Sequence, residues 1–186
     1  MGRPKLTLPL GGQPILSHVL SNLKAAGVNE ILVVIGPHVP ELAGIVAKAG
    51  AHCLSLEDET ADMRETVMHG LVWLENRFHP KPNDGWLLVP ADHATLSVET
   101  VQQVISAFSE QGNHSICLPV YEGKRGHPTL LAWRHAQAIK KLPAGVGLNH
   151  FVRSKSDEIF EVKANSPAVL QDLDAPEDYA KLIAEN

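Results

Sequence analysis

The chain has 186 residues, of which 44% are hydrophobic, so it is long enough to bury the core of one domain of ordinary size. Its net charge of -5 argues against a protein that coats nucleic acid, because such proteins present a basic surface. No apolar run reaches the length of a membrane span, and we expect neither a membrane anchor nor a signal peptide. Cys53 and Cys117 each lie inside an apolar run, which predicts buried free thiols and a reducing cytoplasm.

The start of the chain, residues 1–12, contains several prolines and glycines and shows little periodicity, which predicts a loop rather than a helix. Arg3 and Lys5 are the cations of this loop, and they are the first candidates for a phosphate site. The alternative is that the segment is a solvated tail, as chain ends often are.

From residue 14 onward, hydrophobic periodicity predicts alternating helices and strands. In chain order the predicted elements are a helix at residues 14–26, a strand at 30–35, a helix at 40–49, a strand at 51–56, a helix at 63–76, a buried strand within 85–92, a helix at 98–111, a strand at 115–120, an apolar segment at 129–132, short helices at 134–142 and 147–153, strands at 158–162 and 169–173, and a helix at 176–184. This alternation predicts an α/β fold, a three-layer α/β/α sandwich around a mostly parallel, Rossmann-like sheet, with residues 1–186 forming a single domain.

An acidic loop, residues 57–62, leads into the third predicted helix, whose first turn holds Met63, Arg64 and Thr66. Backbone N–H groups are free at a helix start and can bind a phosphate or a base carbonyl, so these residues are candidate nucleotide contacts. Two simpler interpretations compete with this one. Arg64 can pair with a neighbouring acid, and Met63 can belong to the core.

The stretch 85–92 is a short apolar run that ends in Asp92, and Ser97 follows it as a predicted helix N-cap. Such a run predicts a strand buried on both faces, and in open α/β sheets ligands bind beyond the carboxyl ends of the strands. A carboxylate in that position suits Mg²⁺, which is commonly held by one or two carboxylates and by substrate phosphates. The alternative is that Asp92 only caps a loop. None of the ten histidines, His93 included, shows the spacing of a zinc site or a recognisable triad partner.

Several stretches, taken in order, resemble the MobA-like NTP transferase domain, the fold of the molybdenum-cofactor nucleotidyltransferases. The matching stretches are the opening Met1-Gly-Arg-Pro-Lys5, the strand end Val89-Pro-Ala-Asp92, the turn Gly126-His127-Pro128, the closing Asp172-Leu-Asp174-Ala-Pro-Glu-Asp178 and, more weakly, Asp62-Met63-Arg-Glu-Thr66. Each motif alone is short, but their order and spacing cover nearly the whole chain.

The resemblance implies transfer of a nucleoside monophosphate from an NTP to a phosphorylated acceptor, with release of pyrophosphate. It implies the following roles: Lys5 at the triphosphate with Arg3 beside it; Asp92 on Mg²⁺ with Asp172 or Asp174; Met63, Arg64 and Thr66 near the nucleotide; and Gly126 and His127 at the acceptor. CTP is the favoured nucleotide and molybdopterin the favoured acceptor. Such a transfer depends on positioning and charge neutralisation, which explains why no protein nucleophile is recognisable.

The sequence also departs from the family's pattern. Family members begin with a strand and a Gly-rich loop of the form Leu-Ala-Ala-Gly-x-Ser-x-Arg before the opening motif, whereas this sequence starts at the motif's Met1. The absent strand predicts two neighbouring strands with unpaired backbone groups. Asp62 stands where a glycine is usual, and His93-Ala94 replaces a residue followed by proline.

These departures leave three hypotheses open. The natural start can lie upstream, so that Met1 is an internal methionine of a complete enzyme. The chain can instead be a catalytically degenerate domain that binds a nucleotide or a partner. It can also be a cytidylyltransferase for a sugar phosphate or an isoprenoid-precursor phosphate, because one fold serves many acceptors.

Overall fold

The computed structural model describes residues 4–110, 114–173 and 175–184. Its helices are α1 (Ile15–Ala25), α2 (Leu42–Lys48), α3 (Met63–Phe78), α4 (Val98–Glu110), α5 (Ala136–Lys140), α6 (Leu148–Ser154) and α7 (Pro176–Ala184). Short 3-10 turns are η1 (Lys5–Thr7), η2 (Trp133–His135), η3 (Ser156–Glu158) and η4 (Pro167–Leu170). None of the helices in the described part of the chain is long and apolar enough to cross a membrane.

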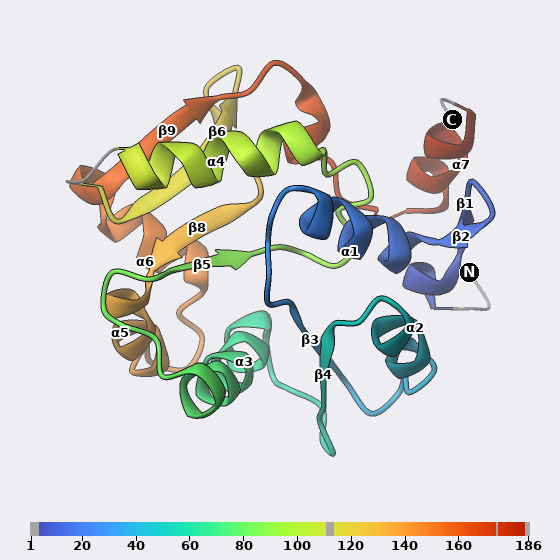
Figure 1. Ribbon diagram of the computed structural model, residues 1–186, viewed down its shortest axis with the longest axis horizontal. Helices are drawn as coiled ribbons and strands as arrows, with labels where there is room; N and C mark the ends of the chain where they lie inside the picture. Colours follow the sequence, from blue (N-terminus) through green and yellow to red (C-terminus); the bar gives the residue numbers. More distant parts are fainter. Residues whose placement is uncertain (1–3, 111–113, 174, 185–186) are drawn as a thin grey trace.

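The strands form two larger groups. Strand β3 (Leu32–Ile35) runs parallel to β4 (His52–Ser55), with Leu32 opposite His52. The second group is a five-stranded sheet in the order β5-β8-β6-β7, with β9 on the other edge of β6 (Figure 1). Its strands are β5 (Gly85–Leu88), β6 (Ile116–Tyr121), β7 (Lys124–Arg125), β8 (Thr129–Ala132) and β9 (Ile159–Lys163).

Strand directions agree with the predicted α/β fold. Strands β5 and β6 are both antiparallel to β8 and therefore run in the same direction, and β9 is parallel to β6. The reversed strands are β8 and the short β7, which the chain forms after the hairpin turn at the end of β6. The β-strand direction is set by pairing between segments far apart in sequence, so the sequence alone did not predict that β8 is reversed.

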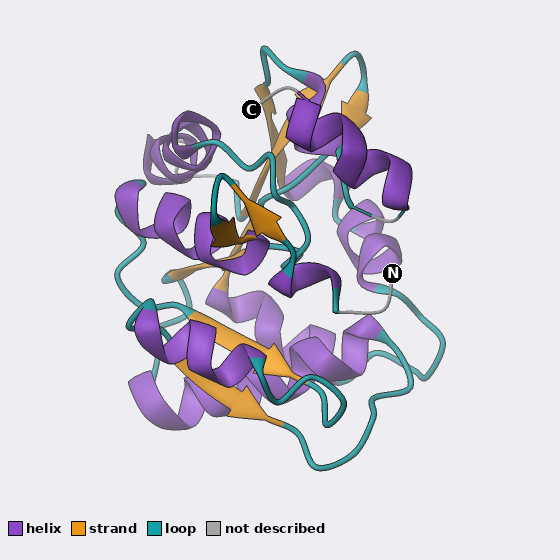
Figure 2. Cartoon of the chain, turned by 90° about the vertical axis from the view of Figure 1, so that its right-hand side faces the viewer, coloured by secondary structure: helices purple, strands orange, loops and turns teal. Residues whose placement is uncertain are grey.

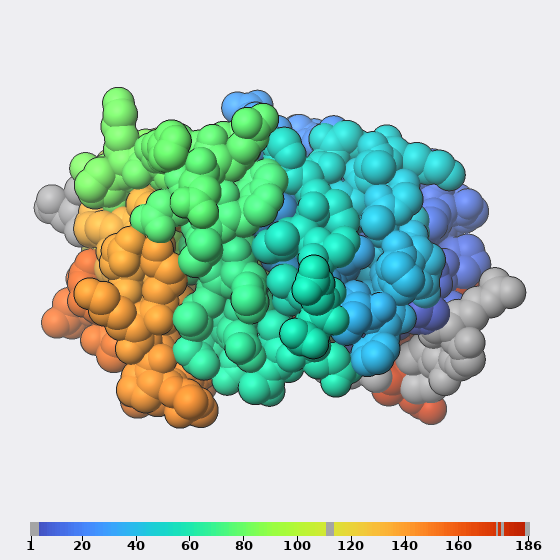
Figure 3. Space-filling view, turned by 90° about the horizontal axis from the view of Figure 1, so that it is seen from below, coloured from blue at the N-terminus to red at the C-terminus, as the bar shows by residue number. Residues whose placement is uncertain are grey.

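Successive side chains of β5 pack against helices on opposite faces of the sheet. Leu87 packs in a core cluster with the apolar faces of α1, α2 and α4, whereas Trp86 and Leu88 pack in another with α3, α5 and α6. Because successive side chains on a strand point to opposite faces, the sheet has helices on both sides. Figure 2 shows this layering from the side, and from below α3 lies between the segment with α5 and α6 and the segment with α2 (Figure 3). The three-layer sandwich is thus confirmed.

The sheet is interrupted between β3 and β5. In the described residues no backbone hydrogen bond joins these two strands, and each pairs with a neighbour on one side only. Helix α3 contacts both, since Gly70 lies against Val34 and Leu32 while Leu71 packs in the cluster that contains Trp86. The helices therefore hold the two strand groups together without a continuous hydrogen-bonded ladder.

Two local predictions were wrong. Residues 169–173 do not form a strand; Val169 belongs to η4, where Pro167 lacks a backbone N–H and the Ser166 hydroxyl caps the amide of Ala168 at 3.2 Å. The opening segment is not a plain loop either. It contains η1 and a small hairpin of β1 (Pro9–Leu10) and β2 (Gln13–Pro14), whose turn uses Gly11 and Gly12 at positive φ.

A partly buried polar network joins the beginnings of β6 and β9. The Ser115 hydroxyl donates to Glu158 at 2.5 Å and accepts from His135 Nε2 at 2.7 Å, and Lys155 donates to the same carboxylate at 2.9 Å. Because Ser115 donates its proton to a carboxylate, it is not arranged as a nucleophile. The hydrogen bonds from Ser115 and Lys155 lower the pKa of Glu158 to about 2. Burial lowers the pKa of His135.

This network predicts an acid-sensitive contribution to stability. A folded-state pKa of about 2, against 4.5 for an unperturbed glutamate, means that the stabilisation is present above pH 4.5 and is lost as the pH falls towards 2. The difference in urea midpoint between wild type and Glu158→Gln should therefore shrink across that window. Glu161→Gln, which removes an exposed ion pair with Arg125, is the control and should change the midpoint little. A pH-independent difference would contradict the assignment.

Candidate active site

The site is built on the turn that follows β5. After Leu88 the chain continues through Val89 and Pro90 to Asp92, and the turn closes through a hydrogen bond from the His93 amide to the Pro90 carbonyl at 3.2 Å. The next helix then begins at Val98, with the Ser97 hydroxyl accepting from the amide of Thr100 at 3.1 Å, as the N-cap prediction required. Asp92 therefore lies just beyond the carboxyl end of β5.

Lys5 reaches this strand end from the start of the chain. Its Nζ lies 2.6 Å from Asp92 Oδ2, and the two side chains are 36% and 18% exposed. Two hydrogen bonds hold the residues that follow Lys5. The amide of Ile15 donates to the Leu8 carbonyl, and the Tyr179 hydroxyl donates to the Pro9 carbonyl at 2.6 Å. The first predicted pair of site residues is thus in direct contact.

Asp172 lies beside the same turn. Its Oδ1 is 3.2 Å from Nδ1 of His93, and its side chain is 41% exposed whereas that of His93 is fully buried. The segment before Asp172 is joined to the turn by the Thr95 hydroxyl, which donates to the Ala168 carbonyl at 3.0 Å. Two of the predicted residues, Arg3 and Asp174, lie outside the described residues.

The Gly126-His127 turn docks on η4. The amide of His127 donates to the Val169 carbonyl at 2.9 Å, and a Cβ on Gly126 would lie 2.1 Å from that carbonyl oxygen, so only glycine allows this approach. The His127 ring is 6.1 Å from that of His93, centre to centre. Burial and the neighbouring His93 lower the pKa of His127, against the opposing influence of Asp172 and Asp92. His127 therefore faces the same cluster as a neutral imidazole near pH 7.

The predicted nucleotide contacts at the start of α3 are arranged differently. Arg64 donates to the Leu142 carbonyl at 3.1 Å and lies 3.6 Å from Asp62, so its predicted pairing with a neighbouring acid is found. Thr66 hydrogen-bonds the Thr60 hydroxyl at 2.6 Å. Met63 is 62% exposed, which shows that the alternative core interpretation was wrong.

The start of α3 is also capped by the protein's own carboxylates. The N-cap Asp62 accepts from the amide of Glu65 at 2.8 Å, and Glu65 accepts from the amide of Ala61 at 2.7 Å, one residue before the amide that a capping box would use. The expectation of a free amide array for phosphate is therefore wrong at Glu65, whose N–H is already taken. The sequence signal was present, because Asp62 followed by Glu65 has the spacing of this motif.

Comparison with known proteins places the chain in a family. The family model for the MobA-like NTP transferase domain matches residues 1–159. The chain belongs to the MobA-like NTP transferase domain family. Two of the stretches that carry the resemblance, at Lys5 and at Asp92, meet beyond the end of β5. No curated protein matches the chain.

Solved structures similar to this family member share its fold. The manganese complex of Rv0371c from Mycobacterium tuberculosis H37Rv is 22% identical, with a TM-score of 0.78, covering 98% of this chain and 93% of that one. A 4-diphosphocytidyl-2C-methyl-D-erythritol synthase is 16% identical, with a TM-score of 0.74 and coverages of 98% and 95%. A cytidylyltransferase from Leptospira borgpetersenii is 15% identical, with a TM-score of 0.76 and coverages of 97% and 78%.

The residues at this site of the MobA-like domain suit a cation that takes most of its ligands from water and from the substrate. In the described residues no group of three or more His, Cys, Asp and Glu side chains is arranged to enclose a metal ion. Asp92 and Asp172 instead offer partly exposed carboxylate oxygens on two segments joined through His93. Hard oxygen donors in this number fit Mg²⁺ or Mn²⁺ completed by water and phosphate oxygens.

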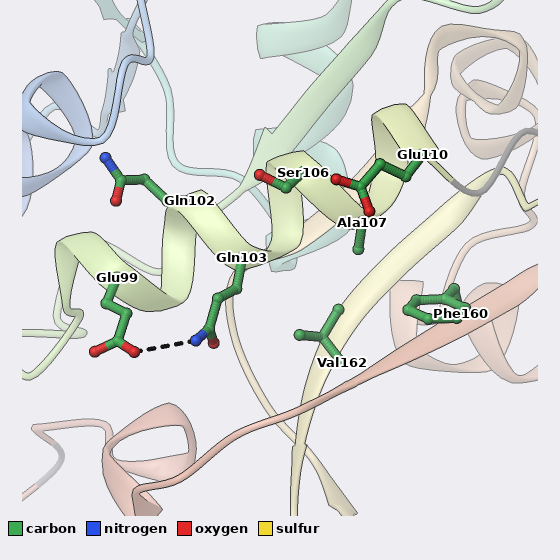
Figure 4. A pocket seen from close by; sticks show the side chains of 8 residues that line it. All are labelled: Glu99, Gln102, Gln103, Ser106, Ala107, Glu110, Phe160 and Val162. Atoms are coloured by element: carbon green, nitrogen blue, oxygen red, sulfur yellow. Dashed lines mark hydrogen bonds between the residues drawn. The ribbon is translucent and has the colours of Figure 1, made fainter.

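A separate pocket of about 390 Å³ lies between α4 and β9 (Figure 4). It is lined by Glu99, Gln102, Gln103, Ser106, Ala107, Glu110, Phe160 and Val162. None of the predicted site residues of this MobA-like domain lines it. Its walls carry two carboxylates and no basic side chain, so it does not suit a nucleoside triphosphate.

Proposed function

We propose that the chain transfers a nucleoside monophosphate from an NTP, with CTP favoured, to a phosphorylated small-molecule acceptor such as molybdopterin, releasing pyrophosphate. The observation that carries the proposal is the contact between Lys5 and Asp92 beyond the carboxyl end of β5, in a chain of this family. At that edge the carboxylate can bind the metal ion of a metal-bound triphosphate, and the lysine can neutralise charge on the phosphates.

The proposed roles follow from charge and position. Asp92 and Asp172 would hold a divalent cation, Mg²⁺ or Mn²⁺, and the manganese in the Rv0371c complex supports this choice of ion. When bound, such a cation would neutralise phosphate oxygens in the transition state. Lys5 would offset the charge that develops on pyrophosphate. His127, neutral and next to this cluster, would border the acceptor with the close-packed Gly126.

The ion pair between Lys5 and Asp92 does not oppose substrate binding strongly. Partly exposed pairs contribute only about 0–1 kcal/mol, so a triphosphate can attract Lys5 away from the carboxylate at low cost. Phosphoryl-type transfer then requires in-line positioning of the acceptor phosphate and no protein nucleophile. No side chain of the protein needs to accept a proton in this step, because an acceptor phosphate is already an anion near pH 7.

Lys5→Gln tests the assignment of the lysine. The change removes the cation but keeps a hydrogen-bonding side chain, and we expect kcat/KM for the NTP to fall by about 10–100-fold, since charge-assisted contacts to a phosphate contribute about 1.5–3 kcal/mol. Lys48→Gln, on the exposed last turn of α2, is the matched control and should leave kcat/KM unchanged. Equal kinetics for Lys5→Gln and wild type would show that Lys5 does not touch the nucleotide.

One observation favours a second candidate, a domain that binds a nucleotide or partner without catalysis. The N-cap of α3, in which Asp62 accepts from the amide of Glu65, occupies an amide expected to meet phosphate. A third possibility within the enzyme class is a cytidylyltransferase acting on a sugar or isoprenoid phosphate. The similarity to the erythritol synthase supports this alternative only at the level of fold.

One assay separates these candidates. Pyrophosphate release should be measured with CTP, GTP, ATP and UTP, with Mg²⁺ or Mn²⁺, against a panel of phosphorylated acceptors that includes molybdopterin, sugar phosphates and isoprenoid-precursor phosphates. The proposal predicts release that requires the metal and is fastest with CTP and molybdopterin. Metal-dependent nucleotide binding by calorimetry without any pyrophosphate release would favour the non-catalytic domain instead.

A further inference from the structure

His93 is an unusual residue for its position. It is fully buried in the turn beyond β5, yet it is polar, and its Nε2 has no hydrogen-bond partner in the described residues. The pocket around it, lined by Thr95, Leu96, Thr100 and Val169 among others, has no room for a water molecule. Burying an unsatisfied nitrogen costs free energy that an apolar side chain of similar size would avoid. Stability of the turn alone therefore does not explain a histidine here.

The other ring nitrogen of His93 has a defined partner. Nδ1 lies 3.2 Å from Asp172 Oδ1. A carboxylate can only accept, so Nδ1 must carry the proton and donate it. The hydrogen is thereby placed on Nδ1, and Nε2 has no hydrogen-bond partner in the described residues, although Thr95, Ser97, Thr100 and His127 line the pocket around the ring. The buried ring of His93 therefore leaves Nε2 without a hydrogen-bond partner, while Nδ1 donates to Asp172.

The placement of this donor links the two carboxylates of the candidate site. Asp92 and His93 are consecutive, and the main chain between them is held by the hydrogen bond from the His93 amide to Pro90. Asp92 pairs with Lys5, while the buried ring of His93 contacts Asp172. Asp172 is 41% exposed and lies in a segment without regular structure, so it needs such a contact to hold one orientation.

We infer that His93 is a positioning residue, which holds the Asp172 carboxylate in register with Asp92 so that the two bind one divalent cation. This inference rests on the proposed function for the identity of the cation site. Carboxylates that bind metals are normally oriented by a further hydrogen bond, and loss of that bond typically lowers metal affinity by about 10–100-fold. His93 acts through Asp172 and need not touch substrate.

A pair of variants separates the donor from the volume of the side chain. His93→Asn and His93→Leu have similar sizes, but only asparagine keeps an N–H donor near the position of Nδ1. Mn²⁺ affinity of the whole chain, without nucleotide, would be measured by electron paramagnetic resonance. We expect His93→Leu to weaken Mn²⁺ binding by about 10–100-fold and His93→Asn to keep it within about threefold of wild type.

A double-mutant cycle and a spectroscopic measurement complete the test. Asp172→Ala should weaken Mn²⁺ binding, and His93→Leu combined with it should cause no further loss, because both changes remove the same interaction. In metal-free wild type, long-range ¹H–¹⁵N correlation spectra should show the proton of His93 on Nδ1. This second readout depends on neither activity nor metal, and it remains decisive if His93→Leu fails to fold.

Four results would overturn the inference. They are Mn²⁺ binding by His93→Leu equal to that of wild type, equal losses for the leucine and asparagine variants, a His93 proton found on Nε2 in place of Nδ1, and wild type that binds no Mn²⁺. By contrast, wild type that binds Mn²⁺, loses this binding in His93→Leu but releases no pyrophosphate would contradict only the proposed transfer activity.

Discussion

Asp92→Asn is expected to reduce pyrophosphate release by at least about 10²–10³-fold, with little change in stability. The substitution keeps the shape of the side chain and removes its charge, so the proposed cation would lose a ligand at the end of β5 and Lys5 would lose its ion-pair partner. The ion pair between Lys5 and Asp92 is partly exposed, and its loss should change the free energy of unfolding by less than about 1 kcal/mol. Kinetics at saturating Mg²⁺ and urea unfolding of the same preparation measure the two quantities.

The matched control for this prediction is Asp157→Asn, an identical change in an exposed 3-10 turn outside the candidate site. It should retain wild-type turnover. Full turnover in Asp92→Asn would refute the role of Asp92, and a large drop in its urea midpoint would mean that the lost activity reflects unfolding.

Gly126→Ala is expected to impair both stability and activity. The added methyl would lie 2.1 Å from the Val169 carbonyl oxygen, whereas ordinary contacts begin at 3.4 Å, so either the turn or η4 must move by more than about 1 Å. Overpacking of this kind usually costs about 1–3 kcal/mol of unfolding free energy. A misplacement of about 1 Å can also lower turnover by about 10²-fold, and His127 lies directly beside the strained position.

Gly44→Ala provides the comparison for Gly126→Ala. Gly44 lies in α2, and nothing is within 4 Å of its added methyl, so alanine should stabilise the helix by up to about 1 kcal/mol and leave activity unchanged. Thermal unfolding and pyrophosphate release measured on both variants give the contrast. A Gly126→Ala protein as stable and active as Gly44→Ala would show that the close contact with Val169 is not required.

Much of the fold was predictable because its signals are local. The apolar periodicity of residues 14–26 located α1, and the capping Ser97 located the start of α4. The direction of β8 was not predictable, because it depends on pairing with β5 and β6 across many residues. Val169 was misassigned to a strand because its apolar neighbours suggested one, whereas Pro167 and the Ser166 cap decide the local backbone.

The candidate site was predictable where a charged residue ends an apolar run or where a family motif is present, as for Asp92 and Lys5. His93 was missed because a single buried histidine in a turn has no periodic signature, and its contact with Asp172 joins segments 79 residues apart. Arg64 and Thr66 were assigned to the nucleotide from their place in a helix turn. Only the structure shows that their side chains contact Leu142 and Thr60.

The central claim is that Asp92 and Asp172 bind one divalent cation beside Lys5. Anomalous diffraction from crystals grown with Mn²⁺ and CTP tests it most directly. We predict a manganese peak within coordination distance of both carboxylates, with the triphosphate between the ion and Lys5. A peak at another position, such as the pocket between α4 and β9, or a triphosphate bound away from Lys5, would contradict the claim.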